Sequence, residues 1–370
     1  MAAGRPHSFL HVSRPDIDLA EGEPADSPQA RGLAASALDR LRRDGLLVRD
    51  RQPAFHAYRM SDGSHGQTGI VGLADVAAYD AGRIRRHETT RPAKQAERAA
   101  HMEALSAQTG PVFLIHRPSA DISALVASAV AAPASTVVAG PGGVRHELWP
   151  IEDPGSIRAL VDAFEALDGL YVADGHHRSA AASIVHARRR SPASAGFLAV
   201  AFPADEVRIL PYNRVARAPA GMSHEEVLAA VSERFQVSPA DGPVTPAAPG
   251  RFGLYLAGRW HELTVPAQLR AGGGAAERLD VAVLQERLLG PVLGIGDPRT
   301  DPRVGFVGGV RPLAELEQAV DAGPWTLAVS MHATTVDDLL GVADAGGTMP
   351  PKSTWFEPKL LDGLVIHVLD

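Results

Sequence analysis

The densest group of residue types that can do chemistry is the run Asp174-Gly175-His176-His177-Arg178. Arginine offers a fixed fork of hydrogen-bond donors, and histidine titrates near neutral pH. The pair Asp174-Gly175 is a turn signal, which lies between the apolar segment 170–173 and an alanine-rich segment that predicts a helix over 179–186. Such a strand–turn–helix joint directs backbone N–H groups and the positive end of a helix dipole to one point. The run therefore favours the binding of an anion, and its alternative is a polar turn without a ligand.

Two other segments contain residues that could act together with this run. His87-Glu88-Thr89-Thr90 places a carboxylate beside an imidazole and two hydroxyls. This set suits a general base or a metal ligand, and equally the cap of a helix that begins at Pro92. Lys352-Ser353-Thr354 places an ammonium beside two hydroxyls in a proline-bounded loop, which can hold a phosphate or a carboxylate or form a surface turn.

Several enzyme classes are excluded by motifs that the sequence lacks. Met349-Pro350-Pro351 precedes Lys352, so the glycine-rich frame of a P-loop ATPase is absent. The sequence also lacks the Gly-x-Ser-x-Gly elbow of hydrolases, the His-Glu-x-x-His zinc motif and a Gly-x-Gly-x-x-Gly fingerprint between a strand and a helix. The chain has no cysteine, which excludes disulfides, thiolate catalysis and zinc–thiolate sites.

The elements around the first run indicate an α/β (α+β) fold. Asp153, followed by proline, is a natural helix start, and apolar residues then repeat at helical spacing as far as Leu167. A short apolar strand leads directly into the turn at Asp174. The segments 196–202 and 207–215 are predicted to be neighbouring strands. This alternation of helices and strands is typical of α/β proteins.

A length of 370 residues predicts more than one domain. We expect an N-terminal helical segment over 1–50 and a catalytic core over 51–217. A C-terminal α/β domain over 218–370 is expected to close the site with the loop 349–359.

Composition and charge exclude other classes of protein. The sequence is 45% hydrophobic and 21% charged, which is typical of a folded globular chain rather than a disordered one. Its net charge of −7 argues against a nucleic-acid-binding protein, which usually has a basic excess. The first residues lack the apolar segment of a signal peptide, and no apolar run reaches the roughly 18–20 residues of a membrane span. We therefore expect a cytoplasmic protein.

Four ordered motifs give the chain a resemblance to a known family. They are His87-Glu-Thr-Thr90, Asp174-Gly-His-His-Arg178, Ile209-Leu-Pro-Tyr-Asn-Arg214 and Met349-Pro-Pro-Lys-Ser-Thr354. Over nearly its whole length the chain looks like the bacterial family numbered 1015 among the domains of unknown function. The second motif also resembles the turn at which proteins of the ParB/sulfiredoxin superfamily bind nucleotide phosphates. The resemblance implies a ParB/sulfiredoxin-like nucleotide-binding core with additional α/β elements.

The trio of His-Glu, Asp-Gly-His-His-Arg and a late Pro-Lys-Ser-Thr is similar to that of archaeal free-serine kinases. This resemblance implies a small-molecule kinase that uses ATP or ADP and Mg²⁺ to phosphorylate the hydroxyl of free L-serine or a similar hydroxy amino acid. It implies that Glu88 is the base, that Asp174 and His177 are catalytic, that Gly175, His176, His177, Arg178 and Ser179 bind the nucleotide phosphates, and that His87, Thr89, Lys352, Ser353 and Thr354 bind the acceptor. Nucleotide phosphates would mainly hold the Mg²⁺, with Asp174 beside it.

The partner that this resemblance implies is a small hydroxy amino acid, without nucleic acid or membrane, and a homodimer is one option for the assembly. Two other functions stay open. One is a ParB-like nucleotide-binding switch protein, against which the negative charge and the absence of a helix-turn-helix argue. The other is a metal-dependent hydrolase, whose metal ligands would be His87, Glu88, Asp174, His176 and His177.

Overall fold

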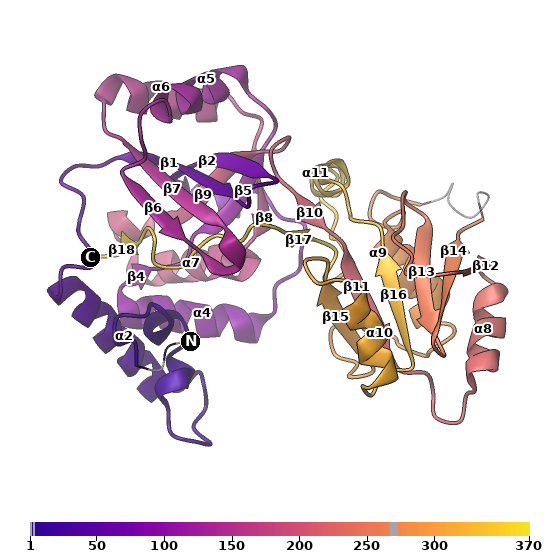
Figure 1. Ribbon diagram of the computed structural model, residues 1–370. Coiled ribbons are helices and arrows are strands. Elements are labelled where there is room, and N and C mark those ends of the chain that lie inside the picture. The colour runs from indigo at the N-terminus through magenta and orange to yellow at the C-terminus, as the bar shows by residue number, and fades with distance from the viewer. Residues whose placement is uncertain (1, 3, 267–272) are drawn as a thin grey trace. The chain divides into compact units, whose positions relative to one another are not determined.

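The computed structural model describes residue 2, residues 4–266 and residues 273–370. The chain forms two compact units (Figure 1). Unit 1 comprises Met1–Val207 and Pro358–Asp370, and unit 2 comprises Arg208–Glu357. The predicted boundary after residue 217 thus differs from the division by contacts, which starts unit 2 at Arg208. The division also returns the C-terminal segment, Pro358–Asp370, to unit 1.

Unit 1 is built on one mixed sheet. Its strands are β1 (Phe55–Ser61), β2 (Gly66–Asp75), β3 (Ile84–Arg85), β5 (Val112–His116), β6 (Thr136–Ala139), β7 (Arg145–Ile151), β8 (Leu170–Asp174) and β9 (Gly196–Pro203). Their order across the sheet is β3-β8-β5-β9-β2-β1-β7-β6. β3 runs parallel to β8 and β5 runs parallel to β9, while the other neighbours are antiparallel. Outside this sheet, β4 (Ala107–Gln108) pairs with β18 (His367–Val368).

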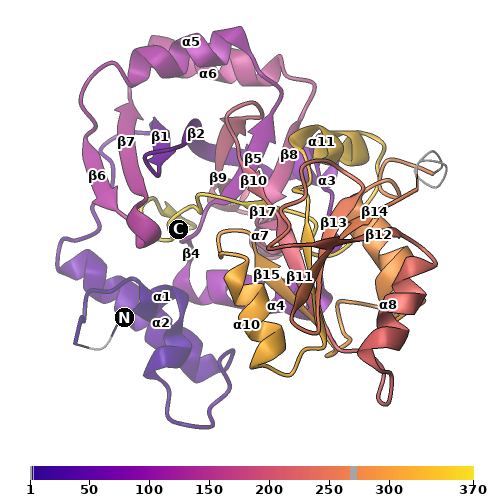
Figure 2. The same cartoon turned by 45° about the vertical axis from the view of Figure 1, so that its right-hand side comes forward.

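Helices cover both faces of this sheet. The helices are α1 (Leu10–Ser13), α2 (Pro28–Arg43), α3 (Val76–Asp80), α4 (Pro92–Leu105), α5 (Ala120–Ala129), α6 (Pro154–Glu165) and α7 (His176–Arg189), with short 3-10 helices at Pro15–Asp18, Pro141–Gly143 and Pro192–Ser194. Figures 1 and 2 both show α5 and α6 side by side on one side of the sheet, with α2, α4 and α7 on the other. The sheet is therefore the middle layer of unit 1.

Two apolar clusters hold these layers together. On the α7 side, Ala181 and Val185 pack in one cluster with Val112 of β5 and Val172 of β8. On the other side, Leu160 of α6 belongs to a cluster that also contains Ile70, Trp149 and Ile151. Because successive side chains of a strand point to opposite faces, one sheet can supply both clusters. The alanines of the segment that predicted a helix, Ala180 to Ala182, are buried in α7.

Unit 2 contains a second, antiparallel sheet. Its strands are β11 (Tyr212–Ala216), β12 (Gln236–Ala240), β13 (Arg251–Leu256), β14 (Arg259–Thr264), β15 (Val304–Gly308) and β16 (Leu327–Met331), in the order β12-β14-β13-β16-β11-β15. Its helices are α8 (His224–Ser232), α9 (Asp280–Leu284), a π-helix at Gln285–Leu289, α10 (Ala314–Asp321) and α11 (Val336–Asp344). A two-stranded pair joins β10 (Ile209–Leu210) to β17 (Trp355–Phe356). Leu316 of α10 packs in a cluster with Val215 and Ala328 of the sheet.

The α/β fold class is confirmed, and so is the helix predicted from Asp153. Helix α6 begins at Pro154, and Asp153 Oδ2 accepts a hydrogen bond from the Ser156 N–H at 2.8 Å. The prediction that 196–202 and 207–215 are neighbouring strands is wrong. β9 has both edges occupied, by β5 and β2 in unit 1, so the chain continues into separate sheets of unit 2 as β10 and β11. None of the described helices is long and apolar enough to cross a membrane.

The joint between β8 and α7 depends on the backbone of Gly175. This residue is the N-cap of α7 and has φ +98°, in the left-handed region that side chains with a Cβ rarely adopt. The helix begins directly after it at His176, before the start predicted at Ser179. The reason is that polar residues are tolerated in the first turn, where the N–H groups need no intrahelical acceptor.

We predict that Gly175→Ala lowers the free energy of unfolding by about 1 kcal/mol, because the added Cβ strains the left-handed backbone. An ideal Cβ at this position comes no closer than 3.4 Å to Val112 Cα, so the backbone conformation rather than a clash sets the cost. Gly32→Ala in the middle of α2 is the control, since a Cβ there meets open space. It should raise stability by roughly 0.5–1 kcal/mol. Urea unfolding measures both, and effects of the same sign would contradict the prediction.

Candidate functional site

The start of α7 is the centre of the candidate site. Asp174 is the last residue of β8, and the Gly175 N-cap makes no side-chain capping hydrogen bond. The N–H groups of Arg178 and Ser179 both donate to the Gly175 carbonyl, at 2.8 and 3.0 Å, which keeps the first turn tight. Helix α7 has 14 residues, and its N-terminus, which lies here, carries a partial positive charge from the helix dipole. The geometry therefore suits an anion at the start of α7.

Two ion pairs connect the C-terminal segment to this turn. Lys359 Nζ lies 2.9 Å from Asp174 Oδ2, and Arg178 Nη2 lies 3.4 Å from Asp362 Oδ1. The Asp174 side chain is 46% exposed, and the protein around it still works against ionisation, but the charge and hydrogen bond of Lys359 outweigh this effect. With further help from the Arg178 charge, they hold the pKa of Asp174 below its usual value. Asp174 is therefore a carboxylate at neutral pH.

These four charged residues line a cleft of about 690 Å³, which is within the range of small-molecule sites, about 300–1,000 Å³. The other lining residues come from the N-terminal segment, the start of β5 and the residue before it, the end of β6 with the turn that follows, and the C-terminal segment. They are Ser8, Phe9, Leu10, Ser13, Pro111, Phe113, Val138, Ala139, Gly140, Pro141, Leu360 and Leu361. The cleft thus combines a charged end at the start of α7 with mainly apolar walls.

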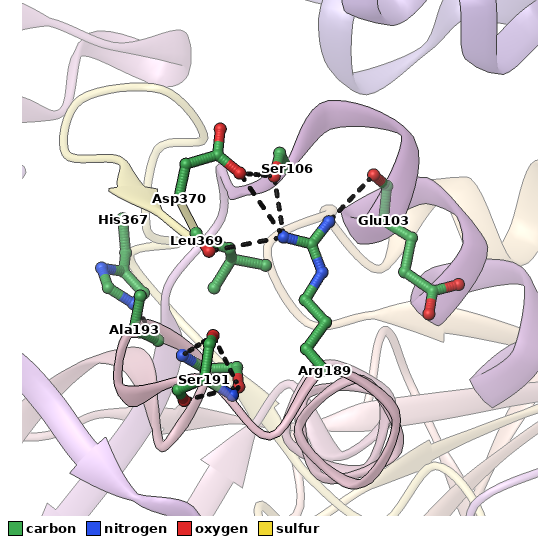
Figure 3. Close-up of polar contacts among 9 residues, drawn as sticks. Glu103, Ser106, Arg189, Ser191, Ala193, His367, Leu369 and Asp370 are labelled. Carbon is green, nitrogen blue, oxygen red and sulfur yellow. Dashed lines mark hydrogen bonds and ion pairs between the residues drawn. The ribbon is translucent and has the colours of Figure 1, made fainter.

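The C-terminal segment is fastened at its far end by the last turn of α7 (Figure 3). Arg189 Nη1 donates to Ser106 Oγ at 2.8 Å and to the Leu369 carbonyl at 3.4 Å, and it lies 3.6 Å from Asp370 Oδ1. His367 Nε2 lies 2.6 Å from the Ala193 carbonyl oxygen. Helix α7 therefore contacts this segment at both ends, through Arg178 in its first turn and Arg189 in its last.

Glu88 lies beside a pair of buried histidines. Its Oε2 is 3.9 Å from His176 Nδ1, and its side chain is 39% exposed. The rings of His176 and His87 meet edge to face, with centroids 4.4 Å apart. Within the described part of the chain, His87 Nδ1 and His176 Nε2 have no hydrogen-bond partner. The structure thus brings together the His-Glu pair and the Asp174–Arg178 run, which lie far apart in the sequence.

Burial keeps both histidines neutral. It lowers the pKa of His87 to about 4, although a hydrogen bond to the Val172 backbone and the Asp174 charge act in the opposite direction. Burial and the neighbouring His87 hold the pKa of His176 well below its usual value. The ring that lies 3.9 Å from Glu88 Oε2 is therefore a neutral imidazole and not an imidazolium.

The remaining unit 1 residues of the predicted site have different surroundings. His177 Nε2 accepts a hydrogen bond from the Arg91 N–H at 3.2 Å, so its ring carries the proton on Nδ1 when neutral. Thr89 is exposed. Ser179 is fully buried, and its hydroxyl donates to the His176 carbonyl at 3.1 Å. Because both of its donors are used inside the helix, a phosphate contact by Ser179 stays a prediction that would require these bonds to open.

The predicted substrate loop, Lys352-Ser353-Thr354, lies in unit 2 and is held by buried side chains of that unit. Arg214 Nη2 donates to the Lys352 carbonyl at 2.9 Å, and burial lowers the pKa of Arg214 to about 10. Ser353 Oγ donates to the Pro350 carbonyl at 2.6 Å. Lys352 adopts φ +59°, a strained conformation for a residue with a side chain. The approach of this loop to the unit 1 residues stays a prediction.

The donor set fits a magnesium ion held largely by phosphates better than a metal held by protein alone. Mg²⁺ is typically bound by one or two carboxylates together with substrate phosphates. Asp174 and Asp362 are carboxylates that line the charged end of the cleft. Among the residues that the structure describes, no group of three or more His, Asp or Glu side chains is placed to hold a metal ion. The metal-dependent hydrolase with five protein ligands is therefore not supported.

Three residues of this arrangement were not among the predicted site residues. Lys359 and Asp362 lie in the C-terminal segment, and Arg214 lies in the motif Ile209–Arg214. For Lys359, the available signal was its position in the sequence, because it lies seven residues after Lys352 at the end of the segment 349–359. Nothing local marks Asp362, because its role depends on an ion pair with a residue 184 positions away.

The chain belongs to the family described as protein of unknown function, DUF1015, whose sequence model matches residues 1–282. No curated protein sequence matches the chain. Similar solved structures include a free serine kinase in complex with AMP, at 12% identity and a TM-score of 0.40, covering 79% of this chain and 91% of that one.

The similar structures also include two proteins with other descriptions. A conserved hypothetical protein from Pyrococcus furiosus has 12% identity and a TM-score of 0.39, covering 79% of this chain and 94% of its own. SbnI with a C-terminal truncation, from Staphylococcus aureus, has 10% identity and a TM-score of 0.43, covering 80% and 87%.

The buried neutral state of His87 predicts a pH dependence of stability. The unfolded ring takes up a proton below about pH 6.5, whereas the folded ring does so only near pH 4. Protons therefore bind preferentially to the unfolded chain in this window, and stability falls as the pH falls from 6.5 to 4. Between pH 7.5 and 5 we expect His87 alone to account for a loss of about 1–2 kcal/mol.

Urea unfolding of the wild type and of His87→Gln at both pH values measures this contribution. The variant should be less stable at neutral pH, because it disturbs a packed site, yet lose less stability on acidification. Curves that stay parallel between the two pH values would contradict a neutral, buried His87.

Proposed function

We propose that this chain is a nucleotide-dependent phosphotransferase. It transfers a phosphoryl group from ATP or ADP to the hydroxyl of free L-serine or a similar hydroxy amino acid. One observation carries the proposal. A helix start without a side-chain cap lies next to two cations, Arg178 and Lys359, at the charged end of a cleft. The motif resemblance to free-serine kinases suggests the reaction type, and the geometry at the start of α7 supports the binding of an anion there.

In the proposed complex, the phosphates bind at the start of α7. Backbone N–H groups of Gly175 to His177 and the Arg178 guanidinium are the donors, because charge-assisted hydrogen bonds to phosphate are among the strongest in proteins. The base and sugar lie along the apolar walls, which include the rings of Phe9 and Phe113. An amphiphilic cleft of this kind matches a nucleotide, whose base has flat aromatic faces and whose phosphates are charged.

Phosphoryl transfer requires positioning, neutralised charge and a group that accepts the hydroxyl proton. Glu88 is the proposed base, because its carboxylate is partly exposed and the His176 ring, 3.9 Å away, is neutral. His177 is proposed to donate its Nδ1 proton to an oxygen of the transferred group. Mg²⁺, when bound with the nucleotide, would lie beside Asp174 and neutralise phosphate charge.

The proposed acceptor-binding residues are His87, Thr89 and the loop Lys352–Thr354, as the motif resemblance implies. The Lys352 ammonium suits the carboxylate of an amino acid, and Thr354 offers a further hydroxyl. Ser353 would act through its backbone, since its hydroxyl is bonded to Pro350. Thr89 can contact the acceptor directly because it is exposed, whereas His87 would act through His176, behind which it is buried.

We predict that the purified chain, given ATP or ADP, Mg²⁺ and L-serine, forms O-phosphoserine. Glu88→Gln should lower turnover by roughly 10²–10⁴-fold while nucleotide affinity changes little, because the base acts on the acceptor and not on the phosphates. Glu97→Gln is the matched control, since Glu97 pairs with Lys94 on the exposed side of α4. Phosphoserine is measured by mass spectrometry and nucleotide affinity by calorimetry. Undiminished turnover in Glu88→Gln would remove the proposed base.

A further inference from the structure

We infer that the C-terminal segment supplies the second phosphate-binding cation, Lys359, and that phosphate binds by exchange of ion-pair partners. In the structure Lys359 pairs with Asp174 and Arg178 pairs with Asp362. An incoming phosphate chain takes both cations, and both carboxylates are released. The inference rests on the proposed function, because the phosphate chain is that of the proposed nucleotide.

The four residues form one charge group rather than two separate pairs. All of them line the same cleft, and the Arg178 charge also acts on Asp174. The two positive and two negative charges sum to zero. Each cation already contacts an anionic carboxylate, whose place a phosphate oxygen can take. Gly110 makes room for the group, since a Cβ there would overlap Asp362 Oδ1 and crowd Arg178 Nε at 3.2 Å.

The exposure of these four side chains lowers the free-energy cost of breaking the two ion pairs. Arg178 and Asp362 are each 34% exposed, and Lys359 and Asp174 are 44% and 46% exposed. Ion pairs with this access to water contribute little to stability, and the 3.4 Å separation of Arg178 and Asp362 is long for a strong one. A phosphate chain offers several charged acceptors at once and also gains the N–H groups of α7. The carboxylates, in turn, can be hydrated after release.

The C-terminal segment holds Lys359 in place by contacts that do not use its charge. The Gly363 N–H donates to the Thr109 carbonyl at 2.7 Å, and the Leu369 N–H donates to the Ser106 carbonyl at 2.8 Å. β18 pairs with β4, and Arg189 fastens the chain end. Substitution of Lys359 should therefore leave the segment where it is, so an effect on binding reports the lost cation.

Calorimetric titration with tripolyphosphate, in the absence of divalent cations and at one fixed salt concentration, tests the exchange. Lys359→Ala should weaken binding by about 10–100-fold, as expected for loss of a charge-assisted contact. Asp362→Asn should tighten binding by about 2–5-fold, because it frees Arg178 from its competing carboxylate. Lys94→Ala is the control for the loss of one positive charge, since Lys94 forms an exposed pair on α4, and it should leave binding within twofold.

Three results would overturn the inference. They are no binding of tripolyphosphate to the wild type, an effect of Lys359→Ala no larger than that of Lys94→Ala, and weaker binding by Asp362→Asn. Lys359→Gln, which keeps the length of the side chain, replaces Lys359→Ala if thermal unfolding shows that the alanine variant is not folded.

The same variants separate this inference from the proposed function. If the affinities for tripolyphosphate shift as expected but the wild type forms no O-phosphoserine, the phosphate site is supported and the kinase reaction is rejected. If the wild type forms O-phosphoserine but Lys359→Ala and Asp362→Asn leave the affinity for tripolyphosphate unchanged, the reaction is supported and the exchange of ion-pair partners is rejected.

Discussion

The packing of α7 against the sheet of unit 1 is the interaction on which the candidate site depends. Ala181 and Val185 bury one face of the helix against β5 and β8, and this fixes the direction of its N-terminus. Gly175 then allows the chain to leave β8 and enter the helix within one residue, because it can adopt a left-handed backbone. Asp174 and Arg178 are thereby held on either side of one helix start. The proposed anion site is a consequence of the way the helix packs.

The same helix also organises the C-terminal segment, which contributes side chains that no local pattern would assign to the site. Arg189 fastens the chain end at one end of α7, and Arg178 meets Asp362 at the other. The segment held in this way places Lys359 in an ion pair with Asp174. Behind the turn, His87 and His176 form a buried, neutral layer that carries Glu88 on its exposed side.

Much of the local structure could be predicted from the sequence, and the long-range pairings could not. The cap at Asp153, the strand before Asp174 and the turn are local signals, and each depends on a few adjacent residues. The helix start was predicted too late because a polar first turn has no apolar period to detect. The pairs Asp174–Lys359 and Arg178–Asp362 join residues that only the return of the C-terminus to unit 1 brings together. The burial of His87 likewise follows from packing against His176 and not from its neighbours in sequence.

The central claim is that the start of α7 binds nucleotide phosphates, and a crystal structure of the chain with bound ADP tests it most directly. The account predicts the terminal phosphate within hydrogen-bond distance, about 2.7–3.2 Å, of first-turn N–H groups of α7 and of Arg178 and Lys359. It also predicts that the Asp174–Lys359 and Arg178–Asp362 pairs are broken in that complex. Phosphates bound away from the start of α7, with both ion pairs intact, would contradict it.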